Sequence, residues 1–343
     1  MSLEIRIDRT FSAVSNAVDK GRIPGAVLGV VNRLGQRATR IAGQAQSVPY
    51  SRSMEVDTWF DLASLTKVVF TAPRILALHE SGVIDLEAPL ISVLPDLNQY
   101  HSGSWIRNVT FAQCLAHETG FPAVEPIYTY GRDPALLRAF VLQRDWKRGP
   151  AVYSDINFIL LGLVLERIHG CRLRELSPGA GLAFEADPEN CAATELCTWR
   201  ERVMCGEVHD DNCYALEGAG HAGLFGTVNA VLDHAQSLLD GIGTGSGMVP
   251  DSGTSTFCIE KMRQRVNATR TYGWEGKHKN WSGGELCSEG TIGHTGFTGT
   301  GLWIDFDNGL AWTLLTNRIH PTRHSDSGIV ALRKTVSEGF YLS

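Results

Sequence analysis

Three short motifs, far apart in the chain, carry side chains that together could perform acyl transfer. They are Ser64-Leu65-Thr66-Lys67, Tyr153-Ser154-Asp155 and His294-Thr295-Gly296. The first pairs a hydroxyl with an ammonium, the second adds a phenol that can relay a proton, and the third belongs to a strand whose backbone N–H can stabilise an oxyanion. Each motif alone could arise by chance, and their joint occurrence predicts a nucleophilic serine.

Ser64 and Lys67 lie three positions apart at the predicted start of a helix, which places both side chains on one face. A helix N-terminus has free N–H groups, so we predict the Ser64 amide as one oxyanion donor. A serine here is usually a helix cap, and the other motifs favour a nucleophile instead. Tyr153, ordinarily a packing residue, would accept the Ser64 proton and return it to the leaving group if Lys67 stabilised its phenolate.

The third motif opens a glycine-rich segment, Phe297-Thr298-Gly299-Thr300-Gly301. Glycines let a substrate backbone lie close to a strand. We predict the Phe297 N–H as the second oxyanion donor, and assign Thr295, Gly296 and Thr298 to substrate binding.

The elements that must position these residues form a simple order along the chain. Apolar runs at 25–31 and 37–41 predict strands near the N-terminus, and 300–305 and 310–316 predict a hairpin that turns at Asp307-Asn308-Gly309. Helices are expected between these strands, and they are followed by a last helix over 325–340.

Two of the intervening helices carry the motifs. One should run from Ser64 to His79 with a kink at Pro73, and the other from Ser154 to His169, closed by Gly170. Further helices are predicted over 6–20, 111–117, 134–144 and 228–240, with loops over 171–220 and a flexible loop at 241–253.

This order predicts an α/β (α+β) fold, in which an antiparallel sheet formed from both termini is flanked by helices. Residues 1–62 and 228–343 would form the sheet domain, and 63–227 a mostly helical domain inserted in it. The active site is expected in the cleft between the two domains.

Composition limits the classes of partner. The chain has 343 residues, 43% hydrophobic and 20% charged, with a net charge of −6. The charge disfavours nucleic acid and anionic membranes, and no apolar run approaches the length of a membrane span. The N-terminus shows no signal peptide, which predicts a cytoplasmic protein acting on a small-molecule substrate. The oligomeric state is left open.

No metal or other cofactor is predicted. Cys191, Cys197, Cys205 and Cys213 lack zinc-ribbon spacing, so reduced thiols are the expected state. The segment His209-Asp210-Asp211-Asn212 has the composition of a metal site and is expected to be a polar turn. Signatures of α/β-hydrolases, phosphate loops and dinucleotide folds are missing from the sequence.

At this point the chain resembles the serine β-lactamase and penicillin-binding-protein superfamily, with class C β-lactamases, DD-peptidases and carboxylesterases as relatives. The resemblance spans most of the chain and rests on five segments: Phe60 to Lys67, Leu115 to Pro122, Tyr153 to Asp155, Gly220 to Phe225 and His294 to Gly296. It implies the β-lactamase/transpeptidase fold, an acyl-enzyme on Ser64, and general-base roles for Lys67 and Tyr153.

The chain departs from the superfamily pattern at two positions. Asp155 replaces an asparagine, and we expect its carboxylate to keep Lys67 charged, so that Tyr153 is the working base. His294 replaces a lysine and is largely neutral near pH 7, which removes a charge for a substrate carboxylate. His294 therefore predicts weak activity on penicillins and cephalosporins and better activity on uncharged esters or amides.

The sequence leaves two functions open. The first is a serine hydrolase that acts through acyl-Ser64 on small esters, amides or D-amino-acid peptides, with weak β-lactamase activity. The alternative is a penicillin-binding or sensing protein on the same scaffold with little or no turnover. The group that activates the deacylating water is not visible in the sequence.

Overall fold

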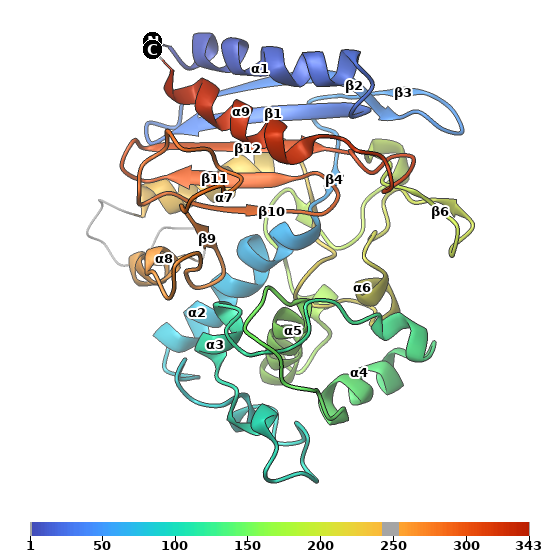
Figure 1. Ribbon diagram of the computed structural model, residues 1–343, viewed down its shortest axis with the longest axis vertical. Coiled ribbons are helices and arrows are strands. Elements are labelled where there is room, and N and C mark those ends of the chain that lie inside the picture. Colours follow the sequence, from blue (N-terminus) through green and yellow to red (C-terminus); the bar gives the residue numbers. More distant parts are fainter. Residues whose placement is uncertain (1, 242–253, 343) are drawn as a thin grey trace.

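A computed structural model describes residues 2–241 and 254–342 (Figure 1). A seven-stranded sheet occupies one end of the molecule, in the order β3-β2-β1-β12-β11-β10-β9, and its pairings are antiparallel. Strands from the two ends of the chain meet where β1 pairs with β12, for example Leu28 opposite Leu314. The expected α+β class and the sheet built from both termini are therefore confirmed.

The strands of this sheet are β1 (Gly25–Asn32), β2 (Arg37–Gln46), β3 (Arg52–Ser53), β9 (Glu275–Gly276), β10 (Ile292–Thr295), β11 (Gly301–Asp305) and β12 (Leu310–Thr316). Two smaller sheets contain β4 (Phe60–Asp61), β8 (Phe225–Gly226) and β5 (Leu182–Ala183), and β6 (Leu196–Cys197) with β7 (Arg202–Val203).

The helices are α1 (Leu3–Asp19), α2 (Ala72–Glu80), α3 (Phe111–Leu115), α4 (Pro134–Gln143), α5 (Asp155–His169), α6 (Asp211–Ala215), α7 (Val228–Asp240), α8 (Thr256–Arg263) and α9 (Ile329–Tyr341). The helices predicted from the sequence occur with ends shifted by a few residues, except the one expected from Ser64 to His79, whose α-helical part begins only at Ala72. The loop expected to be flexible falls almost wholly outside the described residues.

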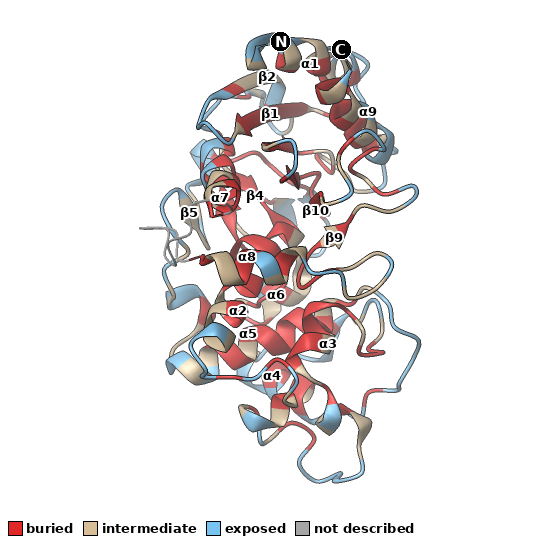
Figure 2. Ribbon diagram, turned by 90° about the vertical axis from the view of Figure 1, so that its left-hand side faces the viewer, coloured by how far each residue is buried: buried red, intermediate tan, exposed pale blue. Residues whose placement is uncertain are grey.

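The inner strand β1 is buried on both faces of the sheet because its side chains alternate between two cores. Val27 and Val31 of β1 face one core together with α7, whereas Ala26, Leu28 and Val30 face a second core beneath α1 and α9. Figure 2 shows buried residues running through β1 and on into the helices below the sheet. The first core continues into α2 and α5, which ties the Ser64 region to the sheet.

The segment that follows Ser64 differs from the predicted regular helix. A 3-10 turn covers Ala63–Leu65, a π-helical turn covers Lys67–Thr71, and only then does α2 begin. Pro73 therefore lies in the first turn of α2, where proline is tolerated and causes no mid-helix break.

Helices from the middle of the chain surround this segment on the side away from the sheet (Figure 1). The described residues thus agree with a mostly helical part between the two halves of the sheet, and the exact limits of 63–227 as a separate domain stay a prediction. Within the described ranges, none of the helices combines the length and apolarity needed to span a membrane.

Candidate active site

Ser64 lies on a turn held in a strained conformation. The residue before it, Ala63, has φ of +47°, a value that costs energy for a residue with a side chain. The buried Asp61 carboxylate holds this turn, because it accepts the Ala63 N–H at 2.8 Å and the His209 N–H at 2.7 Å. A strained turn that presents a serine hydroxyl is the kind of feature found at catalytic sites.

Lys67 is fully buried and makes three hydrogen bonds through its ammonium group. Nζ lies 2.9 Å from Ser64 Oγ, 2.7 Å from Asp155 Oδ1 and 3.2 Å from the His221 carbonyl. Burial by itself would lower the pKa of Lys67, but the Asp155 carboxylate and the Tyr153 phenol outweigh it and raise the pKa. These contacts favour an ammonium at Lys67 that donates to the serine oxygen, and the use of Tyr153 as the working base stays a prediction.

Tyr153 stands beside this ammonium. Its ring centroid is 5.0 Å from Lys67 Nζ and 4.4 Å from the ring of His117. The N-cap of α5, Ser154, follows directly and fixes the start of the helix by accepting the Ile156 N–H. The structure thus brings the hydroxyl, the ammonium and the phenol of the first two motifs together.

The strand that carries the third motif is bound directly to the serine turn. Thr298 donates to the Asp61 carbonyl at 2.8 Å and Thr300 donates to the Leu62 carbonyl at 3.0 Å. Gly296 is required at this approach, since a Cβ there would lie 2.6 Å from the Leu62 oxygen. Thr298 is 1% exposed and its hydroxyl is engaged in this contact, so its side chain faces the serine turn, and its role in substrate binding stays a prediction.

The predicted oxyanion donors are both available. Phe297 lies in the turn after β10, half-exposed, and Ser64 lies in the 3-10 turn. Among the described residues, no carbonyl accepts the N–H of Ser64 or of Phe297. Thr295 is half-buried next to them, and Gly296 forms the closest approach of the two segments.

His294 is 3% exposed and lies behind Tyr153, with ring centroids 5.9 Å apart. Burial, then the charges of Lys67 and Arg270, lower the pKa of His294 well below its usual value. The neutral ring donates from Nδ1 to the Thr295 carbonyl at 3.1 Å, which leaves Nε2 as a buried acceptor without a partner in the described part of the chain. His294 therefore carries no charge near neutral pH.

A cavity of about 320 Å³ opens beside Ser64. Its polar wall includes Asp155, Asp210 and Arg323. Arg323 is paired with Glu195 at 2.6 Å, and this carboxylate also contacts His209 at 3.0 Å. The segment around His209 and Asp210, which we expected to be a polar turn, thus lines the cavity.

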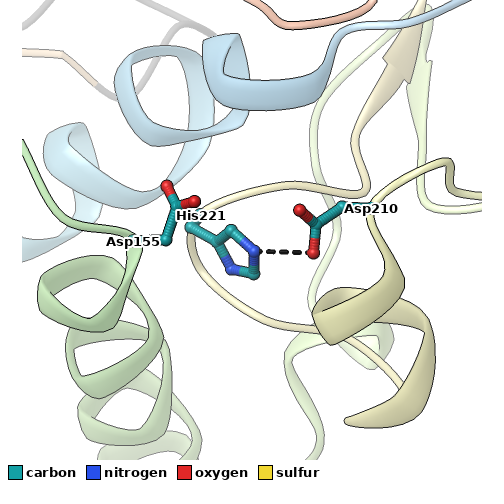
Figure 3. A group of neighbouring side chains, drawn as sticks. All are labelled: Asp155, Asp210 and His221. Carbon is teal, nitrogen blue, oxygen red and sulfur yellow. Dashed lines mark hydrogen bonds and ion pairs between the residues drawn. The ribbon is translucent and has the colours of Figure 1, made fainter. Parts of the chain in front are cut away.

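One group of side chains has the arrangement of a metal site. Oxygen and nitrogen atoms of Asp155, Asp210 and His221 lie within 4.8 Å of one another, and Figure 3 shows the His221 ring paired with Asp210 beside the α5 carboxylate. His221 Nε2 is 2.8 Å from Asp210 Oδ1. Because the Lys67 ammonium already neutralises Asp155, the local charge balance does not require a metal ion.

The sequence motifs did not identify three residues that shape this site. Asp61 holds the strained turn, His221 supplies a carbonyl to Lys67, and Arg270 lies over the Tyr153 ring. Asp61 and His221 belong to segments that resemble the superfamily. The sequence therefore pointed to these segments but did not predict what the two residues do. Arg270 carries no local signal, since an isolated arginine in a loop has no pattern.

The eight cysteines are all free thiols, as expected. Burial raises the pKa of Cys114, Cys191, Cys213 and Cys258, which makes them poor nucleophiles and metal ligands near neutral pH. Their surroundings are those of small core residues.

The comparisons with known proteins agree with this geometry. The β-lactamase family profile matches residues 11–336. An N-acetylmuramyl-L-alanine amidase of Bacillus subtilis is 28% identical over 87% of this chain and 78% of its own length. A putative D-alanyl-D-alanine carboxypeptidase of Escherichia coli O157:H7 is 28% identical over 77% of this chain and 70% of its own.

Solved structures share the fold. EstCE1, a hydrolase with promiscuous acyltransferase activity, superposes with a TM-score of 0.73 at 19% identity and covers 98% of each chain. Fold and motifs together define a β-lactamase-type protein with a Ser-x-x-Lys motif at Ser64 to Lys67. The chain belongs to the β-lactamase family, and its relatives are hydrolases.

Proposed function

We propose that this protein is a serine hydrolase that forms an acyl-enzyme on Ser64. The observation that carries the proposal is the contact of Lys67 Nζ with Ser64 Oγ at 2.9 Å, beside a phenol and two backbone N–H groups that no carbonyl of the described residues accepts. Nucleophile, cation, proton carrier and oxyanion donors are the components that acyl transfer needs.

In the acylation step, Ser64 Oγ attacks the carbonyl carbon of the substrate. The charge that develops on the carbonyl oxygen is held by the N–H groups of Ser64 and Phe297. Tyr153 takes the serine proton, and Lys67 stabilises the phenolate. As the bond to the leaving oxygen or nitrogen breaks, Tyr153 gives that proton to the leaving group.

Deacylation runs through the same groups in reverse. Water takes the place of the leaving group and loses a proton to Tyr153 as its oxygen attacks the acyl carbon. The ester bond to Ser64 then breaks, and the proton returns to Oγ. The Asp155 carboxylate keeps Lys67 charged throughout, which makes the phenol rather than the amine the working base.

The substrates we propose are small esters, amides or D-amino-acid peptides. The names of the amidase and carboxypeptidase relatives support amide chemistry, and the fold shared with EstCE1 is compatible with ester chemistry. The neutral His294 supplies no charge to a β-lactam carboxylate, so we expect weak β-lactamase activity.

The test uses p-nitrophenyl butyrate and a fluorescent penicillin, with wild type and Ser64→Ala. We expect ester turnover that falls by about 10³-fold or more in Ser64→Ala. Stable penicillin labelling without turnover of either compound would favour the sensing protein instead. Ester turnover that survives in Ser64→Ala would contradict the acyl-Ser64 mechanism.

A further inference from the structure

Arg333 is a buried arginine on α9 to which the proposed mechanism gives no role. The residue is 6% exposed. Throughout residues 2–241 and 254–342, no carboxylate lies within 4 Å of its guanidinium nitrogens, and Glu275 acts on it only through the longer-range attraction of its charge. Burial lowers the pKa of Arg333 to about 9, which still leaves a cation at pH 7. A buried cation without a carboxylate partner is costly, so its position depends on the carbonyl groups that it contacts.

Arg333 is bound to the turn that joins β10 to β11. Its Nη2 donates to the Gly296 carbonyl at 3.1 Å and to the Thr300 carbonyl at 2.7 Å. The same two carbonyls close the turn, because the Gly296 oxygen accepts the Gly299 N–H at 3.1 Å and the Thr300 oxygen accepts the Gly296 N–H at 2.9 Å. The guanidinium therefore ties α9 to both ends of this turn.

The Gly296 carbonyl belongs to the same peptide unit as the Phe297 N–H. This peptide bond is trans, since neither of the cis bonds found in the described residues involves it. In a planar trans peptide the C=O and the N–H point in opposite directions. With its oxygen held by Arg333, the peptide directs the Phe297 N–H away from the guanidinium, and Phe297 lines the same cavity of about 320 Å³ as Ser64. Arg333 thus fixes the direction of the predicted second oxyanion donor.

The charge of Arg333 acts on this donor as well. A cation at the carbonyl oxygen polarises the peptide unit, which makes the N–H at its other end a stronger donor. During acyl transfer, negative charge develops on the substrate oxygen that this N–H would bind. The resulting stabilisation is larger in the transition state than in the bound substrate, so it raises kcat without tightening substrate binding.

We propose that Arg333 is a positioning residue for acyl transfer, which orients and polarises the Gly296–Phe297 peptide so that the Phe297 N–H stabilises the oxyanion. The inference rests on the proposed serine hydrolase function and deepens it, since it adds a third layer behind the serine and the oxyanion donor. The hydrogen bonds of Arg333 within the described residues go to carbonyl groups, so it acts through the peptide and not on the substrate.

The experiment measures kcat and KM for p-nitrophenyl butyrate, and Ki for phenylboronic acid, in wild type, Arg333→Met, Arg333→Gln and Arg333→Lys. Phenylboronic acid adds to a serine oxygen and forms a negatively charged tetrahedral adduct, so its Ki reports how well the site stabilises the charge of the transition state. A partly unfolded preparation lowers the apparent kcat but leaves Ki unchanged, which separates the proposed role from a loss of folded protein.

Arg9→Met is the matched control. Arg9 also donates to a carbonyl of α9, that of Gly339 at 2.6 Å. Gly339 lies six residues after Arg333, about 9 Å further along the helix and away from the β10–β11 turn. Arg9→Met therefore removes an arginine-to-carbonyl contact of the same helix without changing the oxyanion peptide.

We expect kcat of Arg333→Met to fall by about 10- to 100-fold, with KM changed by less than about threefold and Ki raised by a factor similar to the loss in kcat. Arg333→Gln loses the charge and should behave in the same direction. Arg333→Lys keeps the charge on a side chain that is one bond shorter, so it should recover part of the loss and still raise Ki by about threefold. Arg9→Met should keep the wild-type kcat and Ki.

A wild-type Ki in whichever of the Arg333 variants fold would overturn the assignment. An increase in KM at unchanged kcat would also overturn it, because Arg333 would then act in substrate binding. If Ser64→Ala is inactive and the Arg333 variants keep the wild-type Ki, only this inference fails. If Ser64→Ala hydrolyses the ester as fast as wild type, the proposed function fails and the inference fails with it.

Discussion

The two sides of Ser64 are built differently. On the cavity side, which we define by Asp155, Asp210, Glu195 and Arg323, each charge has a partner: Asp155 with Lys67, Asp210 with His221, and Glu195 with Arg323. On the tyrosine side, defined by Tyr153, His117, His294 and Arg270, a cation and two buried ring nitrogens have no partner among the described residues.

The two sides differ in whether their charged and polar groups are paired within the protein. Paired charges inside a protein fix geometry and contribute little net attraction for a ligand, whereas an unpaired buried polar group is stabilised when a ligand arrives. The paired charges of the cavity side therefore fix the position of Lys67, whereas the Arg270 guanidinium on the tyrosine side lies over the Tyr153 ring with no carboxylate within 4 Å among the described residues. Substitutions on each side should have distinct signatures.

We expect the largest loss of activity from removing the Lys67 ammonium, which lies between the two sides. Lys67→Met removes the donor to Ser64 Oγ and leaves the Asp155 carboxylate without its cation, so kcat/KM for p-nitrophenyl butyrate should fall by about 10³-fold or more. Lys261→Met, on α8, where the ammonium contacts Gln264 at the surface, is the control. Activity within tenfold of wild type, with a native thermal transition, would remove Lys67 from the mechanism.

Gly296→Ala tests the approach of the strand to the serine turn. The added Cβ would meet the Leu62 carbonyl and Thr300 Oγ1, which displaces the Phe297 N–H from the oxyanion. We expect kcat to fall by about 10- to 100-fold with a smaller change in KM. Gly103→Ala, which places a Cβ in open space, should leave kcat unchanged. A normal kcat in Gly296→Ala would contradict Phe297 as a donor.

Asp155→Asn tests whether the carboxylate keeps Lys67 charged. The pKa of Lys67 is raised by Asp155 against the effect of burial, so without this carboxylate the ammonium loses its proton at lower pH. The alkaline limb of the pH–kcat/KM profile should move toward neutral pH by about one unit or more. A profile that stays where it is in wild type would refute Tyr153 as the working base.

Glu195→Gln should affect stability rather than activity. Burial would raise the pKa of Glu195, but hydrogen bonds from His209 and Arg323 lower it to about 2. A folded-state pKa below the unfolded value means that this stability is present above about pH 4.5 and is lost as the pH falls toward 2. At pH 7 the variant should lose about 3 kcal/mol of unfolding free energy in urea, with kcat within about threefold.

The exposed Glu185→Gln serves as its control. The gap between wild type and Glu195→Gln should narrow between pH 4.5 and pH 2. If Glu195→Gln loses much of its kcat while it keeps full stability, the cavity side takes part in catalysis or substrate binding. The two sides of Ser64 would then not differ in the way described.

Local signals were enough to predict most elements. Ser154 and Gly170 bracket α5 because capping and left-handed termination depend on neighbouring residues alone. The strands at both termini followed from apolar runs and the turn at Asp307-Asn308-Gly309, and their positions at the two ends of the chain predicted one antiparallel sheet formed from both termini. The proximity of Ser64, Lys67 and Tyr153 was predicted by the joint occurrence of their motifs.

Features that depend on distant contacts were not predictable. The serine turn with its positive φ at Ala63 is held in part by the β10–β11 segment, which lies far away in the sequence. No local pattern predicts the π-helical turn at Lys67–Thr71 that follows it. The fixed position of Thr298 and the position of Arg270 over Tyr153 have the same origin. An arginine acquires such a role only once the fold has placed it.

Because β1 pairs with β12, the sheet can be completed only after the C-terminal strands have been synthesised. A ribosome-bound chain that has emerged only as far as α7 contains the serine, the lysine and the tyrosine, but β10, β11 and β12 do not yet exist. Such a chain lacks the Phe297 N–H and the ties to the serine turn, so it has no oxyanion site. On the proposed mechanism, we therefore expect activity only after the last strands are translated, and an inert product from any premature stop before β10.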